Sequence, residues 1–464
     1  MEKGTYNKAY VLGITLVSAM GGLLFGYDWV VIGGAKPLYE LYFGISGIPA
    51  MQGWAMSCAL VGCIIGSMLS GMMSDRFGRK SLLTFSALLF VITSIGTGLS
   101  SSFIEFVLFR ISGGVAIGLA SNLSPVYIAE VSPAESRGKF VSLNQLTIVI
   151  GILAAQIVNR LIAQPIAKDS TAVEILNSWN GQMGWRWMFI ACSVPAFLFF
   201  TFMFFVPESP RYLIKKGIAS KAQKVLARIG GEAYAANEII LIKDTVQSET
   251  GKIDLSGFRQ KGMKKIIILG IFIAVFQQWC GINVIFNYAQ EIFSAAGYGV
   301  SDILFNIVIS GSINLIFTFV AINTVDRFGR KPLMLIGAGG LAGIFTILGT
   351  LYFMHVKGIV MLVLVMTAIA CYSMSLAPIT WVVLSEIFPN KIRGAAMAIA
   401  TFSLWAACFI LTYTFPLFNS TLGAAGTFWI YAFISVIGFI FIKFRLPETK
   451  GKSLEQLESL LLNK

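Results

Sequence analysis

The chain has 464 residues, of which 56% are hydrophobic and only 12% are charged, and its formal net charge is +13. A soluble chain usually carries about 25% charged residues, so this composition excludes a soluble globular protein and indicates an integral membrane protein. The basic balance does not require nucleic acid as a partner, because most of the Lys and Arg lie in alternate connectors between apolar runs.

Apolar runs of roughly 20 residues, long enough to cross the hydrocarbon core of a bilayer, recur along the chain and predict twelve transmembrane helices. Met1–Lys8 is short and polar and the first run is too long for the core of a signal peptide, so we expect this run to remain as a span. The approximate spans are 10–34, 52–73, 82–100, 103–126, 140–162, 184–206, 265–293, 302–325, 332–354, 358–386, 394–417 and 425–446.

The basic residues predict the orientation. Lys and Arg gather in the termini and in every second connector, which is the positive-inside pattern and places both termini in the cytoplasm. The long connector 207–264 mixes acids and bases with helical patterns, so we expect a cytoplasmic helical subdomain whose charges form a solvated face or, alternatively, a lipid-binding patch. The predicted parts of the chain are a six-helix half at 1–206, this linker, a second six-helix half at 265–446 and a cytoplasmic segment at 447–464.

Two charges stand within the apolar spans, Asp28 in the first and Arg110 in the fourth. An unpaired Asp or Arg at the centre of a membrane helix costs about 2.5–3.5 kcal/mol on insertion scales, so we expect the two to pair. Pairing keeps Asp28 ionised, and loss of Arg110 as a partner lets Asp28 take a proton. The alternative is a static bridge that joins spans one and four.

Three motifs occur twice at nearly constant offsets, which indicates a six-plus-six duplication with parallel topology. Halves related in this way hold a ligand at their interface near mid-membrane and rock against each other. The repeated motifs are Asp-Arg-Phe-Gly-Arg-Lys at 75–80 and 326–331, Glu-x-x-Pro followed by Arg-Gly at 130–138 and 386–394, and Pro-Glu at 207–208 and 447–448.

The repeated loops supply charged groups at the cytoplasmic ends of the spans. Each Gly allows a tight turn, and each Asp and Arg can pair with the Glu and Arg of the neighbouring repeated loop. Such pairs would clamp the cytoplasmic ends while the protein is open outward, or they are topology determinants and surface pairs worth ~0–1 kcal/mol each. The candidate gate residues are Asp75, Arg79, Glu130, Arg137, Asp326, Arg330, Glu386 and Arg393.

The seventh span contains an uncharged polar stretch. Gln277, Gln278, Asn283 and Asn287 lie where a lipid-facing helix would hold Leu, and Gly281 between the two pairs can loosen the helical turn. Uncompensated amides in hydrocarbon cost several kcal/mol each, roughly, so they should face protein or a water-filled cavity. Amides flanked by aromatic rings suit a neutral polyhydroxylated ligand such as a sugar. The alternative is that they join helices to one another.

The cysteines, the single histidine and the missing catalytic motifs argue against catalysis. The six cysteines lie within spans and include no Cys-x-x-Cys, so neither a disulfide framework nor a metal site is predicted. His355 is the only histidine, and it precedes Lys357 at a predicted external turn. No Walker A pattern or Ser-His-Asp set is found in the sequence, so we expect no enzyme activity and no cofactor.

With these motifs the chain resembles the sugar porter family of the major facilitator superfamily. Within that family it resembles the bacterial proton-coupled monosaccharide symporters. The resemblance runs from about Gly21 to Glu458 and is carried by Gly-Tyr-Asp at 26–28, both six-residue repeated loops, and the motifs at 125–133, 207–213, 277–283 and 447–451. It implies that Asp28 carries the proton with Arg110 as its partner, because uniporters of the family tend to hold Asn there. The residues that it implies in sugar contact are Gln145, Gln277, Gln278, Asn283, Asn314 and Trp381.

One position departs from the family pattern. Members often place Asn or Gln before the Trp of span eleven, whereas this chain has Leu404-Trp405, which favours a smaller or less hydroxylated sugar or a rotated pose. The expected function is proton-coupled import of a pentose or hexose through the cell membrane by alternating access, with a proton-independent uniporter or a sugar-sensing transceptor as alternatives. The expected partners are the sugar, the proton and the lipid bilayer, and we expect a monomer.

Overall fold

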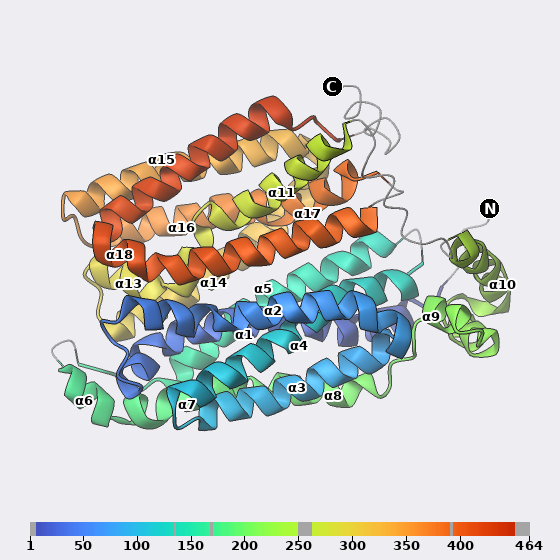
Figure 1. The fold of residues 1–464 in the computed structure, drawn as a ribbon, viewed down its shortest axis with the longest axis horizontal. Helices are drawn as coiled ribbons and strands as arrows, with labels where there is room; N and C mark the ends of the chain where they lie inside the picture. The colour runs from blue at the N-terminus through green and yellow to red at the C-terminus, as the bar shows by residue number, and fades with distance from the viewer. Residues whose placement is uncertain (1–5, 134–135, 168–169, 249–261, 390–392, 451–464) are drawn as a thin grey trace. The chain divides into compact units, whose positions relative to one another are not determined.

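The computed structural model describes residues 6–133, 136–167, 170–248, 262–389 and 393–450, and these residues form helices and connecting turns without a strand (Figure 1). Eleven of the helical segments are long and apolar enough to cross a membrane. The last of them includes α18 (Arg393–Arg445), in which two helices meet at Gly423, where φ is 67°. Counting these two helices separately, the described residues provide the twelve spans that the sequence predicts.

Close contacts divide the chain into two compact units, each described here by itself. The first unit comprises Met1–Asp28, Val61–Gly151 and Phe189–Ile253. Within it lie the first part of α1 (Lys8–Tyr42), the second part of α2 (Pro49–Phe77), α3 (Arg79–Leu99), α4 (Phe103–Val131), most of α5 (Arg137–Ile162), α8 (Ser193–Met203), α9 (Pro210–Lys215) and α10 (Ala219–Ser248).

Glycines bring α2 and α4 of the first unit into backbone contact. A Cβ atom at Gly62 would lie 2.0 Å from the carbonyl oxygen of Ile111, and one at Gly118 would lie 2.3 Å from that of Cys63. Hydrocarbon provides no hydrophobic drive between helices, so small residues that allow close packing supply much of the attraction in a membrane. These contacts hold α4, and with it Arg110, at a fixed depth beside its neighbours.

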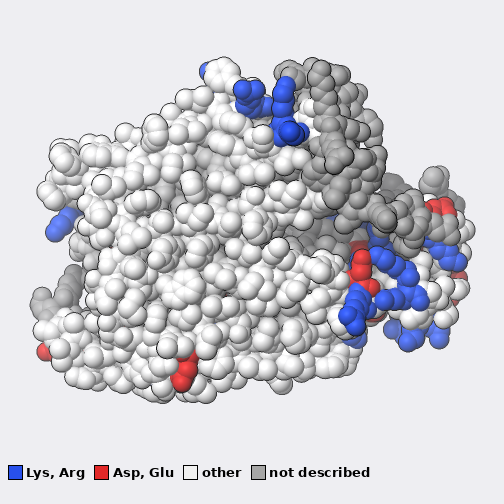
Figure 2. Space-filling view, viewed as in Figure 1, with Lys and Arg blue, Asp and Glu red and all other residues white. Residues whose placement is uncertain are grey.

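The linker forms a small helical subdomain, as the sequence predicts for the part that the structure describes. Leu213, Ile214 and Ala222 are buried together between α9 and α10, with Val225, Ile239 and Ile242 packed against them. Figure 1 places α9 and α10 beyond the ends of α3 and α8, and in Figure 2 many of the visible charges gather at that end, while the helix sides are mostly white apart from a few isolated charges. This charge distribution is that of a protein whose helices face lipid and whose linker faces water.

The second unit comprises Trp29–Leu60, Ile152–Met188 and Asp254–Lys464. It therefore groups the later part of α1 and the earlier part of α2 with the second half of the chain, and the predicted boundaries at 206 and 264 stay a prediction. Its other elements are the end of α5, α6 (Ala172–Asn177), η1 (Asn180–Gly184), most of α7 (Trp185–Ala191), α11 (Met263–Trp279), α12 (Ile282–Asn287), α13 (Ala289–Ala295), α14 (Val300–Phe328), α15 (Arg330–Phe353), α16 (Ile359–Ser373), α17 (Leu376–Ile387) and α18.

Candidate functional site

Span seven breaks at the glycine that separates its two pairs of amides. Helix α11 ends at Trp279, and α12 begins at Ile282 after Gly281, whose φ is 92°. A side chain rarely adopts this conformation, and a Cβ atom here would lie 2.8 Å from the side chain of Tyr431. The break confirms that Gly281 loosens the turn, and it aims the end of α11 and the start of α12 at the same space.

Three of the predicted amides form one hydrogen-bonded chain. Gln278 Nε2 donates to Gln277 Oε1 over 2.6 Å, and Asn283 Nδ2 donates to Gln278 Oε1. Gln277 Nε2 in turn donates over 2.8 Å to the hydroxyl of Tyr372 on α16. Each of the three amides is 7% exposed. The network is buried and uncharged, so it can exchange its hydrogen bonds for those of a neutral ligand without moving a charge.

Asn314 reaches the same part of α16 from another helix. Its Oδ1 accepts a hydrogen bond of 2.7 Å from the hydroxyl of Ser373, which follows Tyr372 directly. Helix α16 therefore connects the amides of span seven with Asn314 of α14. Sequence reasoning missed Tyr372 and Ser373, although two polar residues at the end of the apolar segment Ile359–Ser373 are a signal that could have identified them.

The other two predicted sugar contacts are Trp381 and Gln145. Trp381 is on α17 of the second unit, and 36% of its surface is exposed. Gln145 is a half-buried residue of α5 in the first unit. The structure thus joins Gln277, Gln278 and Asn283 directly and bonds Asn314 to the same segment of α16, and the convergence of all six residues stays a prediction.

Aromatic residues of span eleven pack beside the broken helix. Leu404 and Trp405 are buried, and the ring of Trp405 lies 6.3 Å from that of Trp29, centroid to centroid. Trp279 Nε1 donates to the carbonyl oxygen of Ala407 over 2.9 Å, which joins α11 to α18 next to this pair. At the position of the departure from the family pattern, the aliphatic side chain of Leu404 is buried in the second unit.

The predicted pair of membrane charges is confirmed. Arg110 Nη1 donates to Asp28 Oδ1 over 2.6 Å, and the two residues are 4% and 7% exposed. The guanidinium group also lies 5.5 Å from the centroid of the Phe189 ring, within the range of a cation–π contact. Arg110 therefore has a second stabilising partner besides Asp28.

The three repeated motifs meet at one place in the first unit. Arg79 pairs with Glu130 over 3.0 Å, and Glu208 accepts hydrogen bonds from the backbone N–H groups of Arg79 and Lys80 over 3.0 and 3.1 Å. Gly78, with a φ of 89°, makes the turn that exposes these N–H groups. A carboxylate at the N-terminus of α3 is favourable because the helix dipole is positive there.

The second unit repeats this arrangement. Arg330 pairs with Glu386 over 3.1 Å, and Glu448 accepts from the N–H groups of Arg330 and Lys331 over 3.0 and 3.1 Å after Gly329, whose φ is 91°. Burial raises the pKa of Glu448, but the backbone donors outweigh it and lower the pKa overall. The contacts confirm the predicted pairs of Arg79 with Glu130 and of Arg330 with Glu386.

One expected pair of the gate was wrong. Asp75 does not pair with Arg137 in the described structure; it pairs with Arg79 over 3.4 Å and with Lys215 of α9 over 2.7 Å. Arg137 is exposed and lies near Tyr234, whose pKa burial raises to about 12 while Arg137 opposes the rise. The linker helix supplies a cation that the loop pattern alone did not reveal. The side chains of Asp326 and Arg393 lie outside the described residues.

Comparisons with known proteins agree with this geometry. The model of the family described as "Sugar (and other) transporter" matches residues 14–461. The chain belongs to this sugar transporter family. The D-xylose-proton symporter of Escherichia coli K12 is 40% identical over 98% of the chain and 96% of that protein, and the arabinose-proton symporter of Bacillus subtilis is 38% identical with the same coverages. The solved inward-open structure of the xylose transporter XylE from E. coli matches with a TM-score of 0.84 at 38% identity, over 97% of this chain and 100% of that one.

These matches confirm the predicted family, the all-α transporter fold of twelve membrane helices and the prediction that this sugar transporter is not an enzyme. They extend over both units of the chain, so the paired motifs and the broken seventh span belong to one transporter architecture. The family match and the apolar helices together show that the protein crosses the membrane several times.

Replacing Gly281 with Ala should destabilise the sugar transporter by about 1–3 kcal/mol, because a Cβ atom would force a strained backbone at a φ of 92° and would meet Tyr431. The midpoint of thermal unfolding in detergent measures the effect. The matched control is Gly343→Ala in α15, where a Cβ atom meets nothing within 4 Å. Equal midpoints for the two variants would contradict the role of Gly281 as the break in span seven.

Proposed function

We propose that the protein imports a monosaccharide, a pentose or a hexose, together with a proton by alternating access. The observation that carries the proposal is the buried pair of Asp28 and Arg110, in a chain whose seventh span holds an uncharged amide network. The names of the relatives, a D-xylose-proton symporter and an arabinose-proton symporter, support the same conclusion. The transporter acts in the inner or plasma membrane as a monomer, with both termini in the cytoplasm.

The sugar hydroxyls exchange hydrogen bonds with the amides of span seven and with Asn314. Gln277, Gln278 and Asn283 present both donors and acceptors, which a hydroxyl group needs because it also donates and accepts. Trp381 and Gln145 complete the proposed site, the indole as a flat surface for the sugar ring and the amide as a further hydroxyl partner. No cofactor or metal takes part in this binding.

Asp28 carries the proton and Arg110 is its switchable partner. A proton that moves inward gains about 2.3 kcal/mol per 100 mV of membrane potential, which supports roughly fiftyfold accumulation of a neutral sugar. Coupling requires that charged, unpaired Asp28 block the return step and that sugar binding favour the protonated acid. The motif contacts of Arg79 with Glu130 and of Arg330 with Glu386 then order the cytoplasmic ends as the proposed gate.

The proposal is tested by uptake of labelled pentoses and hexoses into proteoliposomes with and without an imposed pH gradient. We expect at least one monosaccharide to accumulate above its external concentration only when the gradient is present. Uptake that merely equilibrates would identify a uniporter, and binding without uptake would identify a transceptor. Either result would overturn the proposal.

Asp28→Asn should abolish accumulation driven by a pH gradient while sugar exchange across the membrane continues. Asparagine resembles the neutral acid but has no proton to release. Counterflow of labelled sugar measures exchange, and uptake under the gradient measures accumulation. Glu105→Gln, the same chemical change at an exposed residue, is the control and should retain both activities. Retained uphill uptake in Asp28→Asn would move the proton site to another acid, with Glu130 and Glu386 the next to test.

Gln278→Ala should weaken sugar binding by about 1–3 kcal/mol, because it removes the central member of the amide chain and leaves Gln277 and Asn283 without their shared partner. Binding by isothermal titration and thermal unfolding are measured on the same preparation. Gln223→Ala, at an exposed amide of α10, is the control. A lower unfolding midpoint with unchanged sugar affinity would support the alternative that the amides only join helices.

A further inference from the structure

A buried lysine lies near the end of α1, beyond the span that the sequence predicts. Lys36 is 2% exposed and pairs with two carboxylates, Glu40 on its own helix over 2.7 Å and Glu291 on α13. Gln52 of α2 donates to the other oxygen of Glu40 over 2.8 Å. One ammonium group is therefore shared by two acids within the second unit.

This cluster lies where α1 contacts span seven through its backbone. A Cβ atom at Gly33 would lie 3.1 Å from the carbonyl oxygens of both Phe286 and Asn287. One turn later, the ammonium group of Lys36 lies 5.5 Å from the centroid of the Tyr288 ring. Tyr288 separates α12 from α13, so Lys36 and Glu291 join α1 to the part of span seven that follows both of its breaks.

The two partners of Lys36 differ in how they are attached. Glu40 is four residues away on the same helix and stays beside Lys36 however α1 moves. Glu291 belongs to another span, and its side chain is already 26% exposed. If α13 leaves α1, the lysine keeps one carboxylate and the released carboxylate is the one nearest to solvent. Breaking this contact therefore does not strand a bare buried cation, which would be costly.

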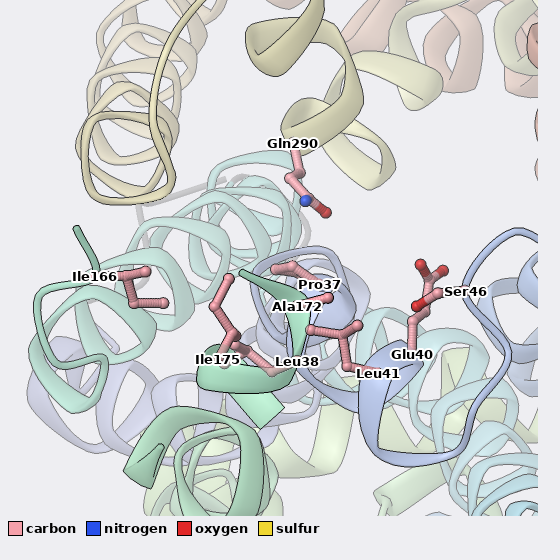
Figure 3. A pocket seen from close by; sticks show the side chains of 9 residues that line it. All are labelled: Pro37, Leu38, Glu40, Leu41, Ser46, Ile166, Ala172, Ile175 and Gln290. Carbon is pink, nitrogen blue, oxygen red and sulfur yellow. The ribbon is translucent and has the colours of Figure 1, made fainter. Parts of the chain in front are cut away.

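A cavity of about 260 Å³ lies next to the cluster. Figure 3 shows Glu40 beside Ser46 at one end of it and Gln290, the neighbour of Glu291, across from Pro37. Glu40 of α1 and Gln290 of α13 both line the cavity, so it adjoins the cluster from both helices. The remaining lining residues are mostly apolar: Leu38, Leu41, Ile166, Ala172 and Ile175.

We propose that Lys36 is a gating residue, which with Glu291 forms an ionic lock between spans one and seven on the external side of the transporter. The lock is closed in this structure and opens to admit sugar from outside. The inference rests on the proposed transport function and on the proposed orientation. It adds a specific charged contact to the cycle, distinct from the proton pair of Asp28 and Arg110 and from the motifs at the cytoplasmic ends.

The test is the reactivity of a cysteine introduced at Ala289, which is 4% exposed and adjoins the lock on α13. A membrane-impermeant maleimide is added outside right-side-out vesicles, and labelling of protein without this cysteine is subtracted. We expect Glu291→Gln and Lys36→Met each to raise the labelling rate by about tenfold, since a lost lock shifts the population towards the outward-open state. Lys357→Met, at an exposed lysine on the same side, is the control and should change nothing.

A charge exchange separates a lock from a merely structural role. Lys36→Glu combined with Glu291→Lys again places one lysine between two carboxylates, and it should return labelling to the parental rate. If Lys36→Met fails to fold, Glu291→Gln and the exchange still decide the question. Parental labelling in Glu291→Gln, an equal rise in Lys357→Met or no rescue by the exchange would overturn the proposal. Labelling requires no knowledge of the sugar, so its outcome is separate from that of the uptake test.

Discussion

The charge pair of Asp28 and Arg110 is the interaction on which the rest of the structure depends. Both groups are buried in membrane helices, and removing one partner of such a pair typically costs about 3–5 kcal/mol because a charge is left uncompensated. In the proposed mechanism, protonation of Asp28 releases the pair without leaving a bare carboxylate. Asp28 is also the last residue of α1 that packs in the first unit, while Trp29 already packs against Trp405 in the second. The carboxyl group of Asp28 therefore lies where α1 passes from the contacts of the first unit to those of the second.

The amide network of span seven is a second buried polar cluster, and unlike the pair of Asp28 and Arg110 it carries no charge. Hydrogen bonds join Gln277, Gln278 and Asn283 to one another and to Tyr372, so each of the three amides has a partner within the protein. In the proposed site a sugar hydroxyl would replace these hydrogen bonds, and each exchange would contribute only about 0.5–1.5 kcal/mol net, which would keep binding reversible. The break at Gly281 is what lets residues from two helical segments join in one network.

The sequence alone predicts those features that follow from the chemistry of individual residues and of their neighbours in the chain. Apolar length predicts the spans, the cost of isolated charge predicts that Asp28 pairs with Arg110, and the glycine among amides indicates a loosened turn in span seven. It did not find Lys215 as a partner of Asp75 or Tyr372 and Ser373 beside the amides, because these contacts arise from packing between segments far apart in the chain. The predicted first span ends at residue 34 and so leaves Lys36 outside it, whereas α1 continues to Tyr42. Its charge is compatible with a buried helix only because Glu40 and Glu291 lie beside it, and Glu291 comes from span seven.

Internal pH shows most directly whether the protein moves a proton and a sugar in the same step. A trapped dye follows it in proteoliposomes that start without a pH gradient, while the transported monosaccharide is added outside. We expect sugar entry to acidify the interior, and we expect Asp28→Asn vesicles, which only exchange sugar when it is also present inside, to give no such signal. Sugar entry into parental vesicles at constant internal pH would contradict proton coupling.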